Sequence, residues 1–273
     1  MKVFRTTSGV VVEKAGRYCS VAGIEWDDLL CSPNPIAVIE AAGQEPIGGL
    51  DHLEVLAPVI NQEVWAAGVT YYRSRDARIE ESQGSGGHTF YDHAYSAERP
   101  ELFFKATGRR VVGSGSAIRI RSDSKWSVPE PELTLVINPA GKIIGYTIGN
   151  DVSARDIEGE NPLYLPQAKI YDGSCAIGPC ILLRSDPLDR NVAITMTIER
   201  DKKTTFSEST TLAELKREPK VLAEFLFRDN SFPQGVFLMT GTGIVPGGSF
   251  TLRKGDVVTI YIDEIGDLRN HVE

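Results

Sequence analysis

The strongest constraint on the fold of this chain is a segment, residues 130–151, whose pattern is that of a single β-hairpin. Apolar residues alternate along its first arm from Leu133 to Ile137, and its second arm carries an apolar run from Ile143 to Ile148. Between the arms, residues 139–142 read Pro-Ala-Gly-Lys, which favours a turn. The pattern therefore predicts two paired antiparallel strands.

Three carboxylates are expected to meet at the open end of this hairpin. If the turn centres between Ala140 and Gly141, paired residues have numbers that sum to about 281, so Glu130 faces Asp151. Glu132 lies on the same face as Glu130, because the side chains of a strand repeat every second residue. Two carboxylates about 4 Å apart repel by roughly 4 kcal/mol at an effective dielectric constant of 20. The cluster therefore needs a cation, a shared proton or water.

An all-oxygen cluster of this kind suits a hard divalent ion. The sequence predicts that Glu130, Glu132 and Asp151 bind Mg²⁺, with Mn²⁺ or Ca²⁺ as alternative ions. Spacing alone leaves open a solvated rim of acidic residues. Pro129 and Pro131 favour the metal site, because they stiffen the backbone on both sides of Glu130.

Composition and charge narrow the classes of protein. The chain has 273 residues, of which 41% are hydrophobic and 24% charged, and no apolar stretch approaches the roughly 18 residues of a membrane span. A net charge of −8 argues against a nucleic-acid partner. The N-terminus carries no apolar signal core, so we expect a cytoplasmic protein with no membrane partner. The cysteines are scattered without a CxxC pair, which indicates free thiols: Cys19, Cys31, Cys175 and Cys180.

The chain is predicted to form two units. Residues 1–60 form a small N-terminal α+β domain, and its last segment, residues 54–60, is expected to be a strand that enters the main body. Residues 61–273 contain many short strands and one helical region, residues 212–226, which restarts at Pro219 as a first-turn proline. This pattern predicts an α+β fold dominated by a rolled, β-rich mixed sheet.

A Gly/Ser stretch at residues 82–87 follows a charged segment that begins at Arg73. Such a composition between two charged segments predicts a mobile flap over residues 73–87. Arg73 and Arg75 are candidates for binding the polar tail of a substrate, and solvated helix charges are the alternative interpretation.

Lys169 stands in an apolar, proline-rich stretch, residues 161–175. Burial and a neighbouring cation both lower the pKa of a lysine, and a lysine with a lowered pKa serves as a general base. The alternative is a structural lysine that pairs with Asp172 or Glu158.

The segment 241–247, Gly-Thr-Gly-Ile-Val-Pro-Gly, is not a nucleotide-binding loop, because Pro246 interrupts it and no helix follows. Its pattern is that of a turn at a strand end. The backbone amides of such a turn could hold an anion or a carboxylate, and a plain turn is the alternative.

Together these motifs resemble the fumarylacetoacetate hydrolase superfamily, and they cover the main body in the same order. The matching segments are 130–132, 149–156, 169–179 and 241–242. The resemblance implies a rolled mixed β-sheet domain, a Mg²⁺-type ion on the three carboxylates, Lys169 at the reacting carbon and assembly into a homo-oligomer.

Within that superfamily, residues 95–107 and 160–167 resemble the 2-keto-3-deoxy-D-arabinonate dehydratases. The resemblance implies a small-molecule 2-oxo sugar acid as substrate: a 2-keto-3-deoxypentonate, such as 2-dehydro-3-deoxy-D-arabinonate, is dehydrated to 2,5-dioxopentanoate. It also implies that Glu101 is a second proton carrier beside Lys169. Three further residues are substrate-binding candidates: Tyr164, Gly241 and Thr242.

The chain departs from the superfamily's hydrolases at the start of the lid. Ser74 and Ala77 stand where those hydrolases carry the histidine and glutamate that activate water. His88 or His93 could substitute, which keeps a metal-dependent acylpyruvate hydrolase or oxaloacetate decarboxylase as the alternative. A catalytically silent 2-oxo-acid binder is a third hypothesis. Dehydration needs no attacking water, so the sequence favours the dehydratase.

Overall fold

A computed structural model describes residues 1–71 and 97–273. These residues form strand-rich mixed sheets with short helices, which confirms the predicted β-rich α+β class. The predicted flap, residues 73–87, lies outside the described residues. No helix in the described ranges is long and apolar enough to cross a bilayer.

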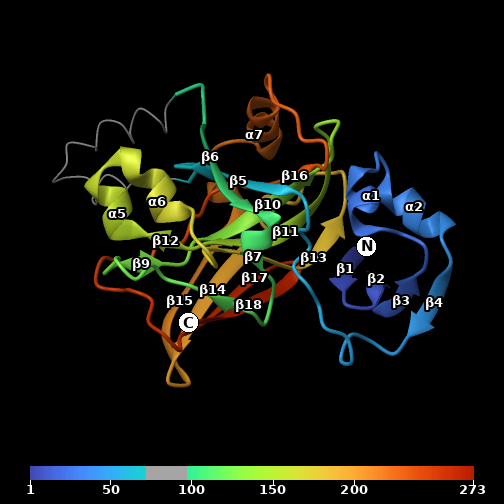
Figure 1. The fold of residues 1–273 in the computed structure, drawn as a ribbon, viewed down its shortest axis with the longest axis horizontal. Coiled ribbons are helices and arrows are strands. Elements are labelled where there is room, and N and C mark those ends of the chain that lie inside the picture. The colour runs from blue at the N-terminus through green and yellow to red at the C-terminus, as the bar shows by residue number, and fades with distance from the viewer. Residues whose placement is uncertain (72–96) are drawn as a thin grey trace.

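The main sheet contains eleven strands (Figure 1). They are β1 (Lys2–Thr6), β2 (Gly9–Lys14), β3 (Arg17–Val21), β4 (Gln44–Ile47), β5 (Glu63–Gly68), β6 (Glu101–Thr107), β7 (Val111–Val112), β10 (Pro131–Ile137), β11 (Ile143–Asp151), β13 (Cys175–Leu183) and β16 (Val236–Met239). Their order is β4-β3-β2-β1-β13-β11-β10-β16-β5-β6, and β7 pairs with β13. The predicted hairpin, β10 and β11, therefore lies inside the sheet rather than at its edge.

A second sheet of five strands packs against the main sheet, and short helices surround both (Figure 1). Its strands are β8 (Ala117–Ile118), β14 (Ala193–Arg200), β15 (Lys203–Thr211), β17 (Val257–Ile262) and β18 (Gly266–Val272), in the order β15-β14-β17-β18-β8. A small pair joins β9 (Ser127–Val128) to β12 (Ser153–Ala154). The helices are α1 (Trp26–Cys31), α2 (Pro35–Ala41), α5 (Arg155–Glu160), α6 (Leu165–Lys169) and α7 (Pro219–Leu226), with 3₁₀ turns η1 (Gly108–Arg110), η2 (Pro162–Tyr164) and η3 (Leu212–Glu214).

Every residue of β10 is buried, because the main sheet is covered on both faces. Leu133, Leu135 and Ile137 belong to the core shared with the five-stranded sheet, whereas Val136 belongs to the core on the other face. Complete burial of each such side chain stabilises the fold by about 1.5–3 kcal/mol. The same alternation directs Glu132 to the face of Val136, away from the five-stranded sheet.

The N-terminal strands extend the main sheet, because β1 pairs with β13 in antiparallel fashion. A domain boundary near residue 60 stays a prediction. The predicted strand over residues 54–60 was wrong: the segment makes only an isolated bridge, between Thr6 and Val55. Pro58 has no N–H to donate to a ladder, which makes a regular strand unfavourable there.

The helical region predicted over residues 212–226 is present as two pieces, η3 and α7. Pro219 occupies the first turn of α7, as predicted, because its missing N–H needs no partner there. Leu222, Ala223 and Leu226 are the buried residues of α7, so the helix is held by one apolar face.

Candidate active site

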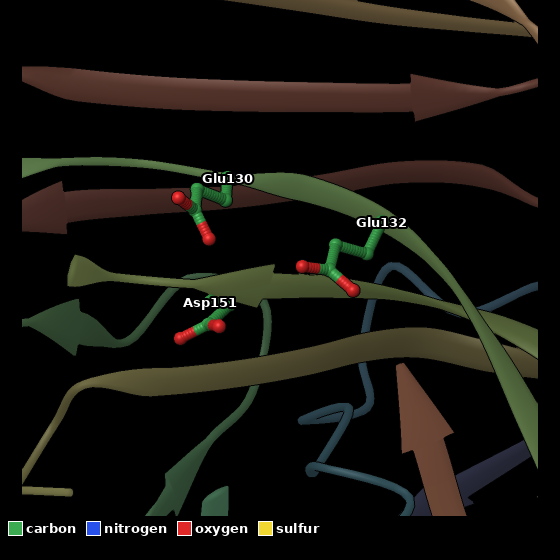
Figure 2. A group of neighbouring side chains, drawn as sticks. All are labelled: Glu130, Glu132 and Asp151. Carbon is green, nitrogen blue, oxygen red and sulfur yellow. The ribbon is translucent and has the colours of Figure 1, made fainter. Parts of the chain in front are cut away.

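The register of the β10–β11 hairpin brings the three carboxylates together as predicted. Pro131 pairs with Asn150, which gives the expected sum of 281, and the amide N of Asp151 lies 3.0 Å from the carbonyl O of Glu130. Figure 2 shows Glu130, which directly precedes β10, and Glu132, on β10, with Asp151 at the end of β11. The hairpin alone therefore positions all three acids.

The cluster is fully enclosed. One oxygen from each of Glu130, Glu132 and Asp151 lies within 4.8 Å of the others, and the three residues are only 1–4% exposed. This burial rules out the solvated rim. Three buried carboxylates of like charge with only oxygen donors fit a hard divalent cation such as Mg²⁺. No other group of potential metal ligands of this kind occurs among the residues that the structure describes.

Glu132 illustrates the electrostatic cost of this arrangement. Burial raises the pKa of its carboxyl well above the ordinary value of 4.5, and the charges of Asp151 and Glu130 raise it further. The charge of Lys169 and a hydrogen bond lower it in part; the bond runs from the amide N of Gly241 to Oε2 of Glu132, at 2.5 Å. The site thus favours a proton on Glu132 until a cation takes its place.

Lys169 is the last residue of α6, and its ammonium group lies among the carboxylates. Its Nζ is 2.6 Å from Oε2 of Glu130 and 2.9 Å from Oδ2 of Asp151. Nζ also donates to Oγ of Ser153 at 2.6 Å. Of the two residues predicted as alternative structural partners of Lys169, Asp172 is exposed and contacts Arg110, whereas Glu158 does lie within ion-pair distance of Lys169. Lys169 is therefore part of the pocket.

Lys105 is a site residue that the sequence analysis missed. It is completely buried in β6, where the pairing with β5 shifts register. Its Nζ lies 2.5 Å from Oδ1 of Asp151 and donates to the carbonyls of Lys169, at 2.6 Å, and Val152, at 3.1 Å. A lysine inside an apolar strand was the available signal, because lysine is almost never fully buried without a partner.

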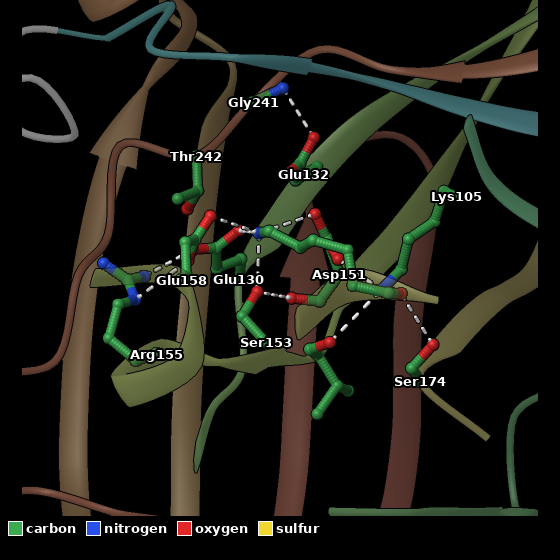
Figure 3. A network of polar contacts seen from close by, with 12 residues as sticks. Lys105, Glu130, Glu132, Asp151, Ser153, Arg155, Glu158, Ser174, Gly241 and Thr242 are labelled. Carbon is green, nitrogen blue, oxygen red and sulfur yellow. Dashed lines mark hydrogen bonds and ion pairs between the residues drawn. The ribbon is translucent and has the colours of Figure 1, made fainter. Parts of the chain in front are cut away.

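Helix α5 supplies two more buried charges, Arg155 and Glu158, one turn apart (Figure 3). Nη2 of Arg155 contacts Oε1 of Glu130, and its Nε lies 3.6 Å from Oε2 of Glu158. Oε1 of Glu158 lies 3.8 Å from Nζ of Lys169. With the carboxylate trio, the region holds four buried carboxyl groups against three buried cations, Lys105, Lys169 and Arg155, which leaves one net negative charge when all four are ionised.

Strand β6 contributes further residues on the other side of the pocket. Glu101 is half-buried, pairs with Gly68 of β5, and extends its carboxylate against that glycine, which borders the pocket. The ring of Phe103 lies 5.6 Å from Nζ of Lys169. On this strand Phe103 lines the pocket and Lys105 reaches Asp151, whereas Glu101 itself is not among the described residues that line the pocket.

The substrate-binding candidates are placed differently from one another. Gly241 and Thr242 border the pocket, as do the acids and Lys169. The hydroxyl of Thr242 accepts a hydrogen bond from the amide N of Ile244 at 3.2 Å and donates to its carbonyl at 3.1 Å, so it stabilises its own turn. Tyr164 is 37% exposed in η2 and does not border the pocket in the described structure.

A larger cavity, of about 490 Å³, lies at the turn end of the hairpin, beside α7. Its walls are mainly apolar and include Leu188, Leu212 and Leu215. No residue of the carboxylate trio borders it. Among the described residues, the concentration of reactive groups is at the small pocket at the opposite end of the hairpin.

Comparison with known proteins identifies the family. The family model described as the fumarylacetoacetate (FAA) hydrolase C-terminal domain matches residues 81–273. The chain belongs to the fumarylacetoacetate hydrolase family. This match confirms the resemblance inferred from the motifs.

Two members of the fumarylacetoacetate hydrolase family illustrate the similarity. A probable 2-keto-3-deoxyxylonate dehydratase of Haloferax volcanii is 50% identical over 216 residues, which span 79% of this chain and 73% of that protein. A 2-dehydro-3-deoxy-D-arabinonate dehydratase of Saccharolobus solfataricus is 40% identical over 289 residues, which span 98% of this chain and 95% of that protein.

A solved structure of the same family gives the corresponding result for the fold. A 2-keto-3-deoxy-D-arabinonate dehydratase in complex with magnesium and 2,5-dioxopentanoate superposes with a TM-score of 0.87 at 36% identity, over 100% of this chain and 99% of that one. The similarity includes the N-terminal strands as well as the sheets that carry the carboxylates.

Residues 72–96 lie outside the described residues, and the predicted start of the lid falls among them. The proposed replacement of the hydrolase histidine and glutamate by Ser74 and Ala77 therefore stays a prediction from the sequence. The other lid candidates also lie outside the described residues, and their roles stay predictions: Arg73, Arg75, His88 and His93.

Proposed function

We propose that this protein is a Mg²⁺-dependent dehydratase that converts a 2-keto-3-deoxypentonate, such as 2-dehydro-3-deoxy-D-arabinonate, to 2,5-dioxopentanoate. The observation that carries the proposal is a complete Glu-Glu-Asp trio in contact with a fully buried lysine, Lys169. The two dehydratases at 40–50% identity support the choice of reaction.

Glu130, Glu132 and Asp151 would hold the magnesium ion. When bound, the ion supplies Lewis-acid chemistry: it polarises the 2-keto group and stabilises negative charge on its oxygen. The excess of one negative charge in the buried cluster and the all-oxygen donor set support this assignment.

Lys169 is the proposed base, and it removes a proton from C3 of the substrate. Its present partners are two of the carboxylates assigned to the metal, so their charge no longer retains the ammonium proton once they are occupied. Lys105 holds the backbone carbonyl of Lys169, which fixes where the lysine side chain begins. The lysine is then directed at the pocket rather than at solvent.

Glu101 is the proposed acid. It would give a proton to the C4 hydroxyl, which leaves as water while the C3–C4 double bond forms. The resulting Glu101 carboxylate then removes a proton from C5, and the Lys169 ammonium returns the first proton to C3. The C4–C5 enol that remains becomes the aldehyde when its hydroxyl proton moves to C4. The net change is loss of one water.

The substrate's own carboxylate and polar tail need partners at the edge of the pocket. We propose Gly241 and Thr242 for the carboxylate, because both border the pocket beside Glu132. Arg73, Arg75 and Tyr164 are proposed for the polar tail on the basis of the sequence.

We also propose that the enzyme acts in the cytoplasm, in pentose catabolism, as a homo-oligomer. The family resemblance supports the assembly. Light scattering of the purified protein tests the assembly: a mass near 29.9 kDa, that of one chain, would contradict it.

The reaction itself is tested by incubating the purified protein with Mg²⁺ and a set of 2-keto-3-deoxypentonates. We expect 2,5-dioxopentanoate by mass spectrometry, and no product when a chelator is present. Acylpyruvates and oxaloacetate serve as competing substrates. Pyruvate formation from an acylpyruvate without any dehydration product would instead establish the hydrolase or decarboxylase alternative.

A further inference from the structure

Gly68, the last residue of β5, lies directly opposite Glu101 in the β5–β6 ladder. Directly opposite residues of an antiparallel pair have Cβ atoms about 4.5–5.5 Å apart and normally compete for the same space. Here one partner has no side chain. The Glu101 carboxylate occupies the space that a side chain at Gly68 would fill, and Gly68 lines the pocket that contains Glu132 and Lys169.

The Glu101 carboxylate fills the space beside Gly68, so a larger residue at position 68 fits only if that carboxylate moves. A Cβ atom built on Gly68 would lie 2.5 Å from Cδ and 2.9 Å from Oε1 of Glu101, and closer still to Oε2. Real Cβ contacts essentially never fall below 3.0 Å. All three heavy atoms nearest to such a Cβ belong to the Glu101 carboxyl group, so the closest conflict is with that group.

Backbone conformation does not explain this glycine. The positive φ angles that favour glycine do not include Gly68. The next residue, Val69, is the one with a φ of 52°, an unfavourable value for a β-branched side chain. The chain therefore has a valine at position 69, where the backbone favours glycine, and a glycine at position 68, where the backbone does not require one. The space that Glu101 needs explains the glycine at position 68.

We propose that Gly68 is a positioning residue of the reaction: its missing side chain is what allows the Glu101 carboxylate to lie across β5 at the edge of the pocket. The inference rests on the proposed role of Glu101 as proton carrier. The carboxylate is the flexible end of its side chain, so an alanine at position 68 is accommodated when Glu101 rotates away. Folding and the metal ligands stay intact, and the proton carrier is displaced.

The test compares Gly68→Ala with Glu101→Ala and with the double variant. We expect Gly68→Ala to lower kcat by about 100-fold, because a shift of about 1 Å in a reacting group has that effect. Its melting temperature and its Mg²⁺ affinity, measured by calorimetry, should match those of the parent protein. In the Glu101→Ala background, Gly68→Ala should have no further effect on kcat, because no carboxylate remains to be displaced.

A matched control is Gly48→Ala. Gly48 is an exposed glycine without a positive φ, and a Cβ built on it meets nothing within 4 Å. This variant should retain the parent kcat, which separates a local effect from a general cost of alanine.

Two results would overturn the inference while leaving the proposed function standing: full kcat in Gly68→Ala when Glu101→Ala is impaired, or multiplicative losses in the double variant. Multiplicative losses would mean that alanine obstructs the substrate rather than Glu101. Full activity of Glu101→Ala would instead refute the proposed acid, and the inference with it.

Discussion

The ion pair between Arg200 and Asp256 and the charged cluster around Lys169 both involve buried carboxylates, but their charges balance differently, and Arg200 is only partly buried. Arg200 binds Asp256 through two hydrogen bonds of 2.7 Å, from Nε and Nη2 to the two carboxylate oxygens. These bonds raise the pKa of Arg200 above its ordinary value. One cation meets one carboxylate, and both oxygens have partners.

Around Lys169, four carboxylates meet three cations, and Glu132 receives only the amide of Gly241 among its hydrogen bonds within the described chain. The balanced pair is complete as it stands, whereas the cluster has one carboxyl group more than it has cations. An ion pair in which each charge has a partner supports the fold, whereas a cluster with an unmatched carboxyl group needs a ligand. Variants at the two places should therefore differ in their effects on stability and on activity.

Lys169→Ala should reduce turnover by about 1,000-fold or more, because general acid–base groups contribute 10²–10⁴-fold. Mg²⁺ binding should persist, since the three carboxylates remain. Steady-state kinetics and calorimetric titration measure the two effects. Lys14→Ala, at a lysine that is 68% exposed, is the control and should behave as the parent. Turnover that survives in Lys169→Ala would exclude this lysine as the base.

Lys105→Met should lower the free energy of unfolding by about 3–5 kcal/mol, because it leaves the buried charge of Asp151 without one of its two ammonium partners. It should also lower kcat, since Lys105 holds the carbonyl of Lys169. Denaturant titration gives the first value. A variant as stable as the parent would show that Lys105 contributes nothing to the balance of the cluster.

Asp256→Asn provides the contrasting case, and it should lower the free energy of unfolding by about 1.5–3 kcal/mol, the usual value of a hydrogen bond to a charged group. Because Asp256 lies beside β17, in the five-stranded sheet, and belongs to no part of the pocket, kcat/KM should not change. A loss of kcat/KM in the folded variant would break the comparison between a structural pair and a ligand-binding cluster.

Glu132→Gln should weaken Mg²⁺ binding by at least roughly 10–100-fold, because loss of a residue that only hydrogen-bonds to a metal ligand already has an effect of that size. The amide keeps the shape of the side chain but removes one negative charge. Metal titration followed by calorimetry measures the change. An unaltered titration would remove Glu132 from the set of ligands.

The smallest effect concerns pH in the metal-free protein. The raised pKa of Glu132 means that the folded state retains this proton to a higher pH than the unfolded state does. Between pH 4.5 and that raised pKa, the free energy of unfolding should therefore fall as pH rises. Glu132→Gln should flatten this part of the pH profile, measured by denaturation in a chelator. An equal slope in both proteins would contradict the assignment.

The hairpin could be predicted from the sequence because all of its determinants are local. Alternation along residues 133–137, the turn at 139–142 and the period of two fix which side chains share a face. The structure reproduces the resulting pairing of Pro131 with Asn150. Lys169 could be identified for a related reason, since a charged residue in an apolar stretch is informative by itself.

Other parts of the molecule depend on contacts that no local pattern reveals. The sequence does not predict strand β18, because one of its inward positions is the polar residue Asn270. Asn270 is buried with its Nδ2 donating to the carbonyls of Gly113 and Ser116. Lys105 meets Asp151 only where the β5–β6 pairing shifts register. Such a shift depends on how distant strands pack, so spacing in the sequence does not predict it.

The pairing of β1 with β13 has a consequence for the biogenesis of the protein. Val3 pairs with Ile181, so the two strands are about 180 residues apart in the chain. At 5–20 residues per second, the ribosome needs roughly 10–35 s to deliver the second strand after the first. During that interval β1 presents an open edge that other nascent chains can pair with. We therefore expect this protein to aggregate mainly during synthesis, before the main sheet is complete.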